Sequence, residues 1–369
     1  MRVVIVGAGI AGVRTAEALR DKGFDGDIVL IGDETEAPYD RPPLSKQVLR
    51  GEREPFFLMP ASLEVDLRLG VAALGLEGRT LRTSAGELGF DELVIATGAH
   101  PRRLPGAPGM VLRTLEDSRR LGALLSPGVR LGIVGAGLIG CEVAASARLL
   151  GAEVQVVDVL PLPLVRLLGP VVARRVLDLH MGRGVQFHLG VGVAAASASS
   201  LLLTDGTDLD VDVVLEAMGV TPTVTWLERS GLDVADGVQC DAVGRAADGV
   251  WALGDVARWG EVRQEHWTSA SEQGDLVAAG ILGDPVPVIS VPYWWSDQYD
   301  VKLQGLGSPS AEDDVVVRDV GPRQRPLAVY SRDGLVTGAV GFSAAAAVMG
   351  LREAISSRQP LDEVLAALT

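Results

Sequence analysis

Two glycine-rich turns are the residues of this chain with the clearest chemistry. Each has the spacing Gly-x-Gly-x-x-Gly, follows a short apolar run and opens a helical pattern. The glycines are Gly7, Gly9 and Gly12 in the first turn, and Gly135, Gly137 and Gly140 in the second. In that context the first two glycines let backbone amides approach a pyrophosphate, and the third lets helix and strand pack closely. A packing role alone is the plainer alternative, but the second copy favours two dinucleotide-binding modules.

Each module also places a carboxylate after its second expected strand, where it can accept the hydroxyls of a ribose. The candidates are Asp33 and Asp158, and the spacing alone does not separate Asp33 from Glu34. After Asp158 the next basic residue is Arg166, so a 2′-phosphate would meet a carboxylate without an adjacent cation. The sequence therefore favours NADH over NADPH.

The elements that must position these residues follow from the same repeat. Unbroken apolar runs indicate parallel strands buried on both faces, and the helices expected over 10–22 and 139–150 end at Gly23 and Gly151. Both modules close on a buried strand that stops at a glycine, Gly98 or Gly219. The later run 249–255 ends in Gly254 and Asp255, and we expect it to pair back into the first module.

The simplest function for one chain that binds two dinucleotides is hydride transfer between a nicotinamide and a flavin. A stiff Pro-Pro turn at 42–43 precedes Ser45, an expected helix cap, and Lys46. A rigid turn can aim a cation, so Lys46 is a candidate donor to the N5/O4 edge of the flavin. A solvated surface lysine is the plainer reading.

Composition excludes several classes of function. The 369 residues include 33 basic and 48 acidic side chains, a net charge of −15 that opposes binding to nucleic acid or to an anionic membrane. The two cysteines, Cys141 and Cys240, form neither a disulfide framework nor a Cys-x-x-Cys pair, and the four histidines suggest no metal site. Without a signal peptide or an apolar stretch of about 18 residues, a cytoplasmic protein is expected.

The fold class expected is α/β, with two Rossmann-like dinucleotide-binding domains of the glutathione-reductase-like kind and a small C-terminal α+β domain. The expected boundaries are 1–109 with 236–292 for the FAD-binding domain, 110–235 for the NAD-binding domain and 293–369 for the C-terminal domain, where short alternating runs predict antiparallel strands.

With these features in place, the sequence resembles the FAD-dependent ferredoxin reductases of bacterial oxygenase systems, the putidaredoxin-reductase-like group, nearly end to end. The segments that carry the resemblance are Pro-Pro-Leu-Ser-Lys (42–46), Ala-Thr-Gly (96–98), Leu-Arg-Thr-Leu-Glu-Asp (112–117), Gly-Ala-Gly-Leu-Ile-Gly-Cys-Glu-Val-Ala (135–144), Ala-Leu-Gly-Asp (252–255), Glu-Gln (272–273) and Trp-Ser-Asp-Gln-Tyr (295–299).

The resemblance implies a set of site residues. FAD contacts are implied for Ala11, Asp33, Arg41, Lys46, Ala73, Thr97, Asp255 and Trp267. To these we add Glu34, Ala96, Gly98 and Gly254 beside FAD, and Leu138, Ile139, Asp158 and Gly219 with the second glycine turn beside NADH. Glu142 would face the nicotinamide, although compensation of the helix dipole is its plainer role. Lys46, Glu142 and Trp295 are the expected catalytic residues, and the tryptophan would cover the flavin or lie on the electron exit path. For Trp294, core packing is as good a reading.

The predicted function is transfer of a hydride from NADH to FAD, followed by single-electron transfer to a 2Fe-2S ferredoxin that supplies an oxygenase. A rubredoxin or quinone acceptor, or a flavin-binding redox-sensing protein, is the alternative. The chain lacks the Cys-x-x-x-x-Cys pair of disulfide reductases, which counts against that activity. The chain departs from the family pattern at Ala217-Met218-Gly219 and Pro222-Thr223, where the family usually has a Gly-Ile-Gly run followed by a proline and an asparagine, and at Gly341-Phe342-Ser343, where it has an asparagine-containing turn. These departures bear on partner docking and on dimerisation, for which a monomer or a homodimer is expected, and leave the flavin site untouched.

Docking of an acidic ferredoxin on an acidic enzyme needs a less repulsive surface. The C-terminal segment is nearly neutral, and its arginines could form a basic patch with two from the Pro-Pro segment. These are Arg318, Arg323, Arg325, Arg332, Arg50 and Arg53. Solvated charges are the plainer reading.

Overall fold

The computed structural model describes residues 1–285 and 291–368. It forms two compact units, each assembled from separate stretches of the chain. The first contains Met1–Asp40, Pro55–His100 and the described part of Val220–Ser290. The second contains Arg41–Glu54, Pro101–Gly219 and the described part of Val291–Thr369.

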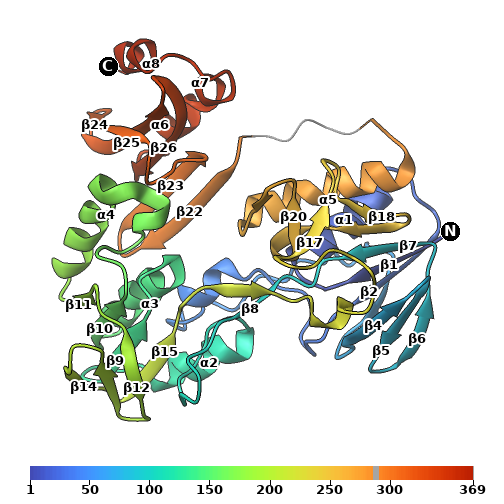
Figure 1. The fold of residues 1–369 in the computed structure, drawn as a ribbon, viewed down its shortest axis with the longest axis horizontal. Coiled ribbons are helices and arrows are strands. Elements are labelled where there is room, and N and C mark those ends of the chain that lie inside the picture. Colours follow the sequence, from blue (N-terminus) through green and yellow to red (C-terminus); the bar gives the residue numbers. More distant parts are fainter. Residues whose placement is uncertain (286–290, 369) are drawn as a thin grey trace. The chain divides into compact units, whose positions relative to one another are not determined.

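A six-stranded sheet with the order β18-β19-β7-β1-β2-β3 is the centre of the first unit (Figure 1). Its strands are β1 (Arg2–Val6), β2 (Asp27–Ile31), β3 (Asp66–Arg68), β7 (Glu92–Ile95), β18 (Arg245–Ala247) and β19 (Val250–Ala252). Strand β19 pairs in parallel with β7, so the expectation that this late strand returns to the first module is confirmed. The strands are apolar on both sides because both faces of the sheet are covered.

Helices α1 (Ile10–Asp21) and α5 (Trp267–Leu282) pack side by side on one face of this sheet (Figure 1). The other face packs against the antiparallel sheet of β4 (Ala73–Glu77), β5 (Thr80–Thr83) and β6 (Gly86–Gly89). The remaining elements of this unit are β8 (Ala99–Pro101), which reaches its boundary, β16 (Val220–Pro222), β17 (Val238–Cys240), β20 (Ala257–Trp259), β21 (Val262–Arg263), η2 (Thr225–Leu227) and η3 (Gly254–Val256).

The second unit repeats this layering. Its parallel sheet has the order β11-β10-β9-β15, with α2 (Leu115–Leu124) and α3 (Leu138–Leu149) packed on one face and a three-stranded antiparallel sheet on the other. The strands are β9 (Arg130–Val134), β10 (Glu153–Asp158), β11 (Gln186–Leu189) and β15 (Val213–Glu216), and the covering sheet consists of β12 (Val193–Ala196), β13 (Ser200–Leu203) and β14 (Asp208–Asp210). The internal repeat predicted from the sequence is thus a repeat of three layers.

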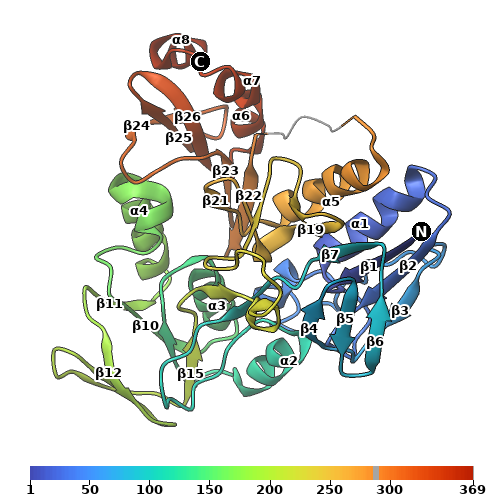
Figure 2. The same ribbon diagram turned by 45° about the vertical axis from the view of Figure 1, so that its right-hand side comes forward.

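The same unit carries the predicted antiparallel α+β region, drawn in orange to red in Figure 2. Its five strands have the order β22-β23-β26-β25-β24, and every pairing is antiparallel. They are β22 (Tyr293–Gln298), β23 (Val301–Gly307), β24 (Asp314–Val320), β25 (Arg325–Arg332) and β26 (Leu335–Phe342), followed by α6 (Ala345–Gly350), α7 (Arg352–Ser356) and α8 (Leu361–Ala367). Strands β23 and β25 also pack against α4 (Val165–Met181), which bends at Gly169 and Pro170.

The turn η1 (Pro42–Ser45) groups with the second unit, whereas the sequence boundaries placed it in the FAD-binding segment 1–109. The reason lies in its contacts, since Ser118 on α2 donates a hydrogen bond to Leu44 O at 2.7 Å and Ser146 on α3 donates to Ser45 O at 2.7 Å. Residues 220–235, assigned from the sequence to the NAD-binding segment, group with the first unit.

Candidate dinucleotide sites and a buried ion pair

The first glycine turn is built so that only one of its three glycines faces open space. Gly7 has a φ of +116°, and a Cβ there would lie 2.1 Å from Ala96 O. A Cβ on Gly12 would lie 2.0 Å from Gly7 O. Gly9, by contrast, has no heavy atom within 4 Å of its Cβ position, and it caps α1 without a side-chain hydrogen bond. Gly7 and Gly12 are thus required for close packing, whereas Gly9 leaves the amides of the first turn of α1 open to an anion.

The second turn has the same construction. A Cβ on Gly135 would lie 2.3 Å from Ala217 O, and one on Gly140 would lie 2.0 Å from Gly135 O. Gly137 faces open space and caps α3 without a side-chain hydrogen bond. Leu138 and Ile139 begin α3, and Ile139 is 43% exposed. Each unit therefore carries a glycine turn, here called a cradle, whose helix N-terminus has no side-chain cap and suits an anion such as a pyrophosphate.

The acidic residues expected beside these turns differ in their contacts. Asp158, at the end of β10, accepts a hydrogen bond from Ala136 N at 2.6 Å, which ties it to the glycine turn, and a second from Leu160 N at 2.8 Å in the segment that follows β10. Asp33 lies just beyond β2 with its side chain exposed. Glu34 instead accepts a hydrogen bond from the hydroxyl of the buried Tyr39. The contact with Tyr39 distinguishes the two residues that the spacing left equivalent.

The remaining residues expected at the first site lie at the same edge of the sheet or next to it. Ala96, Thr97 and Gly98 follow β7, and Thr97 donates a hydrogen bond to Thr223 O at 2.9 Å. Gly254 has a φ of +71°, and its amide donates a hydrogen bond to Gln273 Oε1 on α5 at 2.7 Å. This bond attaches the turn η3, which contains Asp255, to α5.

Three other expected FAD contacts have definite places. Ala11 is a buried residue of α1, Ala73 begins β4, and Trp267 begins α5 and donates to Asp40 Oδ1 at 2.7 Å. In the second unit Gly219 follows β15 with a φ of +90°.

The Pro-Pro turn corrects one sequence expectation. Ser45 does not cap a helix, because it is the last residue of the 3-10 turn η1, and Lys46 is the residue that ends this turn. Arg41, at the start of the turn, donates a hydrogen bond to Arg113 O at 2.6 Å. The residues after the two prolines form turns rather than a helix, so no N-terminal amides are left there for Ser45 to cap.

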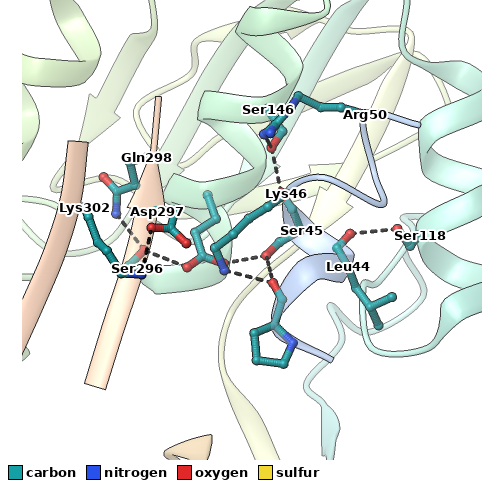
Figure 3. Close-up of polar contacts among 12 residues, drawn as sticks. Leu44, Ser45, Lys46, Arg50, Ser118, Ser146, Ser296, Asp297, Gln298 and Lys302 are labelled. Atoms are coloured by element: carbon teal, nitrogen blue, oxygen red, sulfur yellow. Dashed lines mark hydrogen bonds and ion pairs between the residues drawn. The ribbon is translucent and has the colours of Figure 1, made fainter. Parts of the chain in front are cut away.

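Lys46 and Glu142 form a buried ion pair, and Figure 3 labels Lys46 together with Ser45 and Ser296, two residues that also contact Glu142. Lys46 Nζ lies 2.7 Å from Glu142 Oε2, and both residues are 4% exposed. Lys46 also donates to Pro42 O at 2.9 Å. Glu142 Oε2 accepts a second hydrogen bond from Ser45 Oγ at 2.5 Å, and Glu142 Oε1 accepts one from Ser296 Oγ at 2.7 Å. A solvated lysine is therefore excluded, and the stiff turn holds a charged amine against a carboxylate of the second glycine helix.

The aromatic residues of β22 divide as the alternation of a strand requires. Trp294 is 3% exposed and packs beside Gly305, where a Cβ would lie 2.1 Å from the indole. Trp295 is half-buried, stacks on Tyr293 with a centroid separation of 6.0 Å, and lies under Lys302 Nζ at 5.8 Å. Core packing is thus the role of Trp294.

Sequence reasoning missed Ser296 as a partner of this ion pair, and it missed Gln298, His180 and Tyr299, which are linked to the pair through Ser296. Gln298 Nε2 donates to Ser296 Oγ at 3.1 Å, and Gln298 Oε1 lies 2.9 Å from His180 Nε2. The hydroxyl of Tyr299 lies 3.1 Å from His180 Nδ1. One signal was available, since Ser296 and Gln298 are polar residues on the same face of the strand as the buried Trp294.

Both cysteines are buried free thiols. Burial raises the pKa of Cys240 to about 12. Burial, together with the neighbouring charge of Glu142, raises the pKa of Cys141 as well. Neither thiol has the depressed pKa of a redox nucleophile, which agrees with Cys141 as a buried packing residue. No helix in the described part of the chain is long and apolar enough to span a bilayer.

Comparison with known proteins agrees with this geometry. The chain is 40% identical over 356 residues to the ferredoxin–NAD(+) reductase component of the anthranilate 1,2-dioxygenase system of Burkholderia cepacia, covering 90% of this chain and 87% of that protein. It is 34% identical to the corresponding component of the biphenyl dioxygenase system of Paraburkholderia xenovorans, covering 98% and 96%. The solved covalent complex of putidaredoxin reductase with putidaredoxin superimposes with a TM-score of 0.92 at 30% identity, covering 100% of this chain and 98% of that one.

Two protein-family models match the chain. Residues 1–274 match the pyridine nucleotide-disulphide oxidoreductases, and residues 293–367 match the reductase C-terminal domain. The protein therefore belongs to the pyridine nucleotide-disulphide oxidoreductase family, and it carries a reductase C-terminal domain after the segment that this family model matches.

Proposed function

We propose that this protein is an NADH-dependent ferredoxin reductase, an FAD enzyme that supplies single electrons to a 2Fe-2S ferredoxin of an oxygenase system. The observation that carries the proposal is the repeated glycine cradle, in which Gly9 and Gly137 each leave an uncapped helix N-terminus open. A chain with one such cradle would need only one dinucleotide. Two cradles in a chain without a paired redox disulfide fit a flavin and a nicotinamide.

The first cradle would hold FAD, and the second would hold the nicotinamide nucleotide. In this assignment the amides after Gly9 bind the pyrophosphate, Asp33 accepts the ribose hydroxyls, and Asp255 accepts a ribityl hydroxyl. Asp33 is preferred to Glu34 because Tyr39 already donates to the Glu34 carboxylate. We keep the functional domains proposed from the sequence. Residues 1–109 and 236–292 would bind FAD, residues 110–235 would bind NADH, and residues 293–369 would form the C-terminal domain.

Selection of NADH over NADPH rests on Asp158. Its carboxylate is held by two backbone amides, of which that of Ala136 lies in the glycine turn, so a 2′-phosphate placed at the end of β10 would meet a fixed negative charge. The next side chain, Val159, is 66% exposed and apolar, and Arg166 is the next basic residue. Ribose hydroxyls, by contrast, can donate to the lone pairs of Asp158 that the amides leave.

Lys46 and Glu142 would act together at the reacting edge of the flavin. Bound FAD supplies the ability to accept two electrons together and to release them one at a time. Lys46 would contribute a positive charge that favours negative charge on the flavin ring, and Glu142 would hold that amine in place through their buried ion pair. Trp295, half-buried on β22, would cover the flavin or lie between it and the acceptor.

A ferredoxin is the proposed acceptor for two reasons. The relatives described above include two ferredoxin–NAD(+) reductase components, and a structural neighbour was solved in complex with putidaredoxin. In addition, both cysteines are buried with raised pKa values, so this chain offers no thiol pair for a disulfide or peroxide substrate.

The test is an anaerobic titration of the purified flavoprotein with NADH and, separately, with NADPH, following the absorption band of the oxidised flavin. We expect prompt bleaching by NADH and much slower bleaching by NADPH, and then reoxidation by an added 2Fe-2S ferredoxin. Equal rates with both donors would overturn the Asp158 argument. A band that neither donor bleaches would overturn the reductase assignment itself.

A further inference from the structure

An unbroken series of hydrogen bonds runs from the buried carboxylate of Glu142 to the hydroxyl of Tyr299. Its links are Glu142 to Ser296 at 2.7 Å, Ser296 to Gln298 at 3.1 Å, Gln298 to His180 at 2.9 Å and His180 to Tyr299 at 3.1 Å. Ser296, Gln298 and His180 are fully buried, each with 0% exposure. Three elements contribute to the series, α3, α4 and β22, and all lie in the second unit.

The chemistry of each group assigns a direction to every link. Glu142 is paired with Lys46 and accepts from Ser45, so its oxygens act as acceptors and Ser296 must donate to it. Having used its only proton, Ser296 must accept from Gln298, which therefore presents its amide nitrogen to Ser296 and its oxygen to His180. His180 must then carry its proton on Nε2 and accept the Tyr299 hydroxyl on Nδ1. Every donor in the series points toward Glu142.

The surroundings keep His180 in the neutral form that this direction requires. Burial lowers the pKa of His180 to about 4, against the opposing effect of the hydrogen bond to Gln298. Arg183 lies 5.0 Å from the ring centroid of Tyr299 at the outer end of the series. The titratable or charged side chains around the inner end are Lys46, Cys141, Asp158, Asp297 and Lys302, the last two forming an ion pair at 3.7 Å.

We propose that Ser296, Gln298 and His180 are positioning residues that hold the Glu142 side chain against Lys46, so that β22 completes the hydride-transfer site of the second module. The kinetic consequence of this inference rests on the proposed function. The direction of the hydrogen bonds does not, because it follows from the side chains of the series themselves. It also assigns a task to the C-terminal sheet, which contributes Ser296 and Gln298 to a carboxylate of the glycine helix.

The first test determines the direction of the hydrogen bonds in the series and needs no enzyme turnover. Imidazole nitrogen NMR of protein labelled with ¹⁵N-histidine reports the tautomer of each of the four histidines, and a His180→Gln variant assigns the signals of His180. We expect a neutral Nε2–H tautomer from pH 8 down to about pH 5. A Nδ1–H tautomer, or a charged ring at neutral pH, would contradict the proposed direction.

The second test measures how fast NADH bleaches the flavin as a function of pH. Ser296→Ala removes one hydrogen-bond donor from Glu142, which should move the acid limb of this profile to higher pH and slow flavin reduction several-fold there. Ser331→Ala is the matched control, since Ser331 is also a buried serine but lies on β25, outside the series. If the two profiles coincide, the positioning role is wrong.

Tyr299→Phe and Tyr330→Phe separate positioning from folding. Both tyrosines contact α4, but Tyr330 donates to Leu168 O at 2.7 Å and lies outside the series. We expect a smaller shift of the profile for Tyr299→Phe than for Ser296→Ala, and no shift for Tyr330→Phe. Equal profiles for the two tyrosine variants would also reject the proposal if Ser296→Ala fails to fold. Should NADH not reduce the parent protein, the proposed function fails while the NMR result still decides the series.

Discussion

At the scale of single residues, the glycines of one turn have different tasks although the sequence pattern treats them alike. Gly12 lets α1 pass against the turn, because a Cβ there would lie 2.0 Å from Gly7 O. Gly9 has open space at its Cβ position and a φ of −84°, which an L-residue adopts without strain. Substituting alanine at Gly9 or at Gly12 can therefore separate the effect on ligand binding from the effect on packing.

We expect Gly9→Ala to fold normally and to bind FAD more weakly by about tenfold or more, since its methyl group would occupy the space assigned to the pyrophosphate. Gly12→Ala should instead lower the free energy of unfolding by roughly 2 to 3 kcal/mol, because backbone must move to admit the methyl group. Flavin retained after gel filtration and urea unfolding measure the two effects. Loss of stability in Gly9→Ala equal to that in Gly12→Ala would refute the distinction.

At the scale of elements, the turn η1 depends on the helices against which it packs. Helix α2 begins with a capping box in which Thr114 accepts from Asp117 N and Asp117 accepts from Thr114 N. One turn later, Ser118 of the same helix donates a hydrogen bond to the carbonyl oxygen of Leu44, the residue before Ser45 and Lys46. The start of α2 therefore supports the turn that aims the lysine.

Thr114→Ala should reduce the free energy of unfolding by about 1 kcal/mol, the usual effect of removing a threonine N-cap. Arg120→Ala, an exposed substitution on the same helix, serves as the control and should change stability by less than about 0.5 kcal/mol. Urea unfolding of the two variants at equal flavin content compares them. A Thr114→Ala midpoint no lower than that of Arg120→Ala would mean that this cap does not support the helix.

At the scale of the whole molecule, the net charge of −15 opposes an acidic partner unless the partner meets a local basic surface. The structure removes two arginines from the patch suggested by the sequence, because Arg332 pairs with Asp313 at 2.7 Å and Arg50 pairs with Glu52 at 2.6 Å. Arg323 is exposed and Arg325 is half-buried on β25. These two remain the better candidates for docking.

Reversing both charges, Arg323→Glu with Arg325→Glu, should raise the KM for an acidic ferredoxin by about fivefold or more and leave flavin reduction by NADH unchanged. The matched control reverses Arg174 and Arg175, two exposed neighbours on α4. Steady-state ferredoxin reduction at low and high salt gives the comparison. Unchanged KM in the first double variant, or equal changes in both, would exclude the patch.

Much of this molecule was predictable because its information is local. Buried parallel strands read as unbroken apolar runs, a Gly-x-Gly-x-x-Gly after such a run requires a tight turn, and Gly23 and Gly151 end their helices with φ values of +82° and +84°. The repeat, the return of β19 to the first sheet and the antiparallel C-terminal strands all follow from such patterns. The Pro-Pro turn indicated Lys46 as a candidate, and the resemblance to the ferredoxin reductases added Glu142.

What only the tertiary structure decided is how those candidates meet. Ser45 lies 97 residues from Glu142, Ser296 lies 154 from it, and His180 lies 118 from Gln298. No periodicity along the chain encodes contacts at such separations, because they depend on which faces of α3, α4 and β22 pack together. The sequence by itself thus determined two dinucleotide modules and the residue types at their turns. Tertiary packing made one lysine, one glutamate and a series of buried donors into a single charged centre, since a buried carboxylate is stable only where other elements bring it partners.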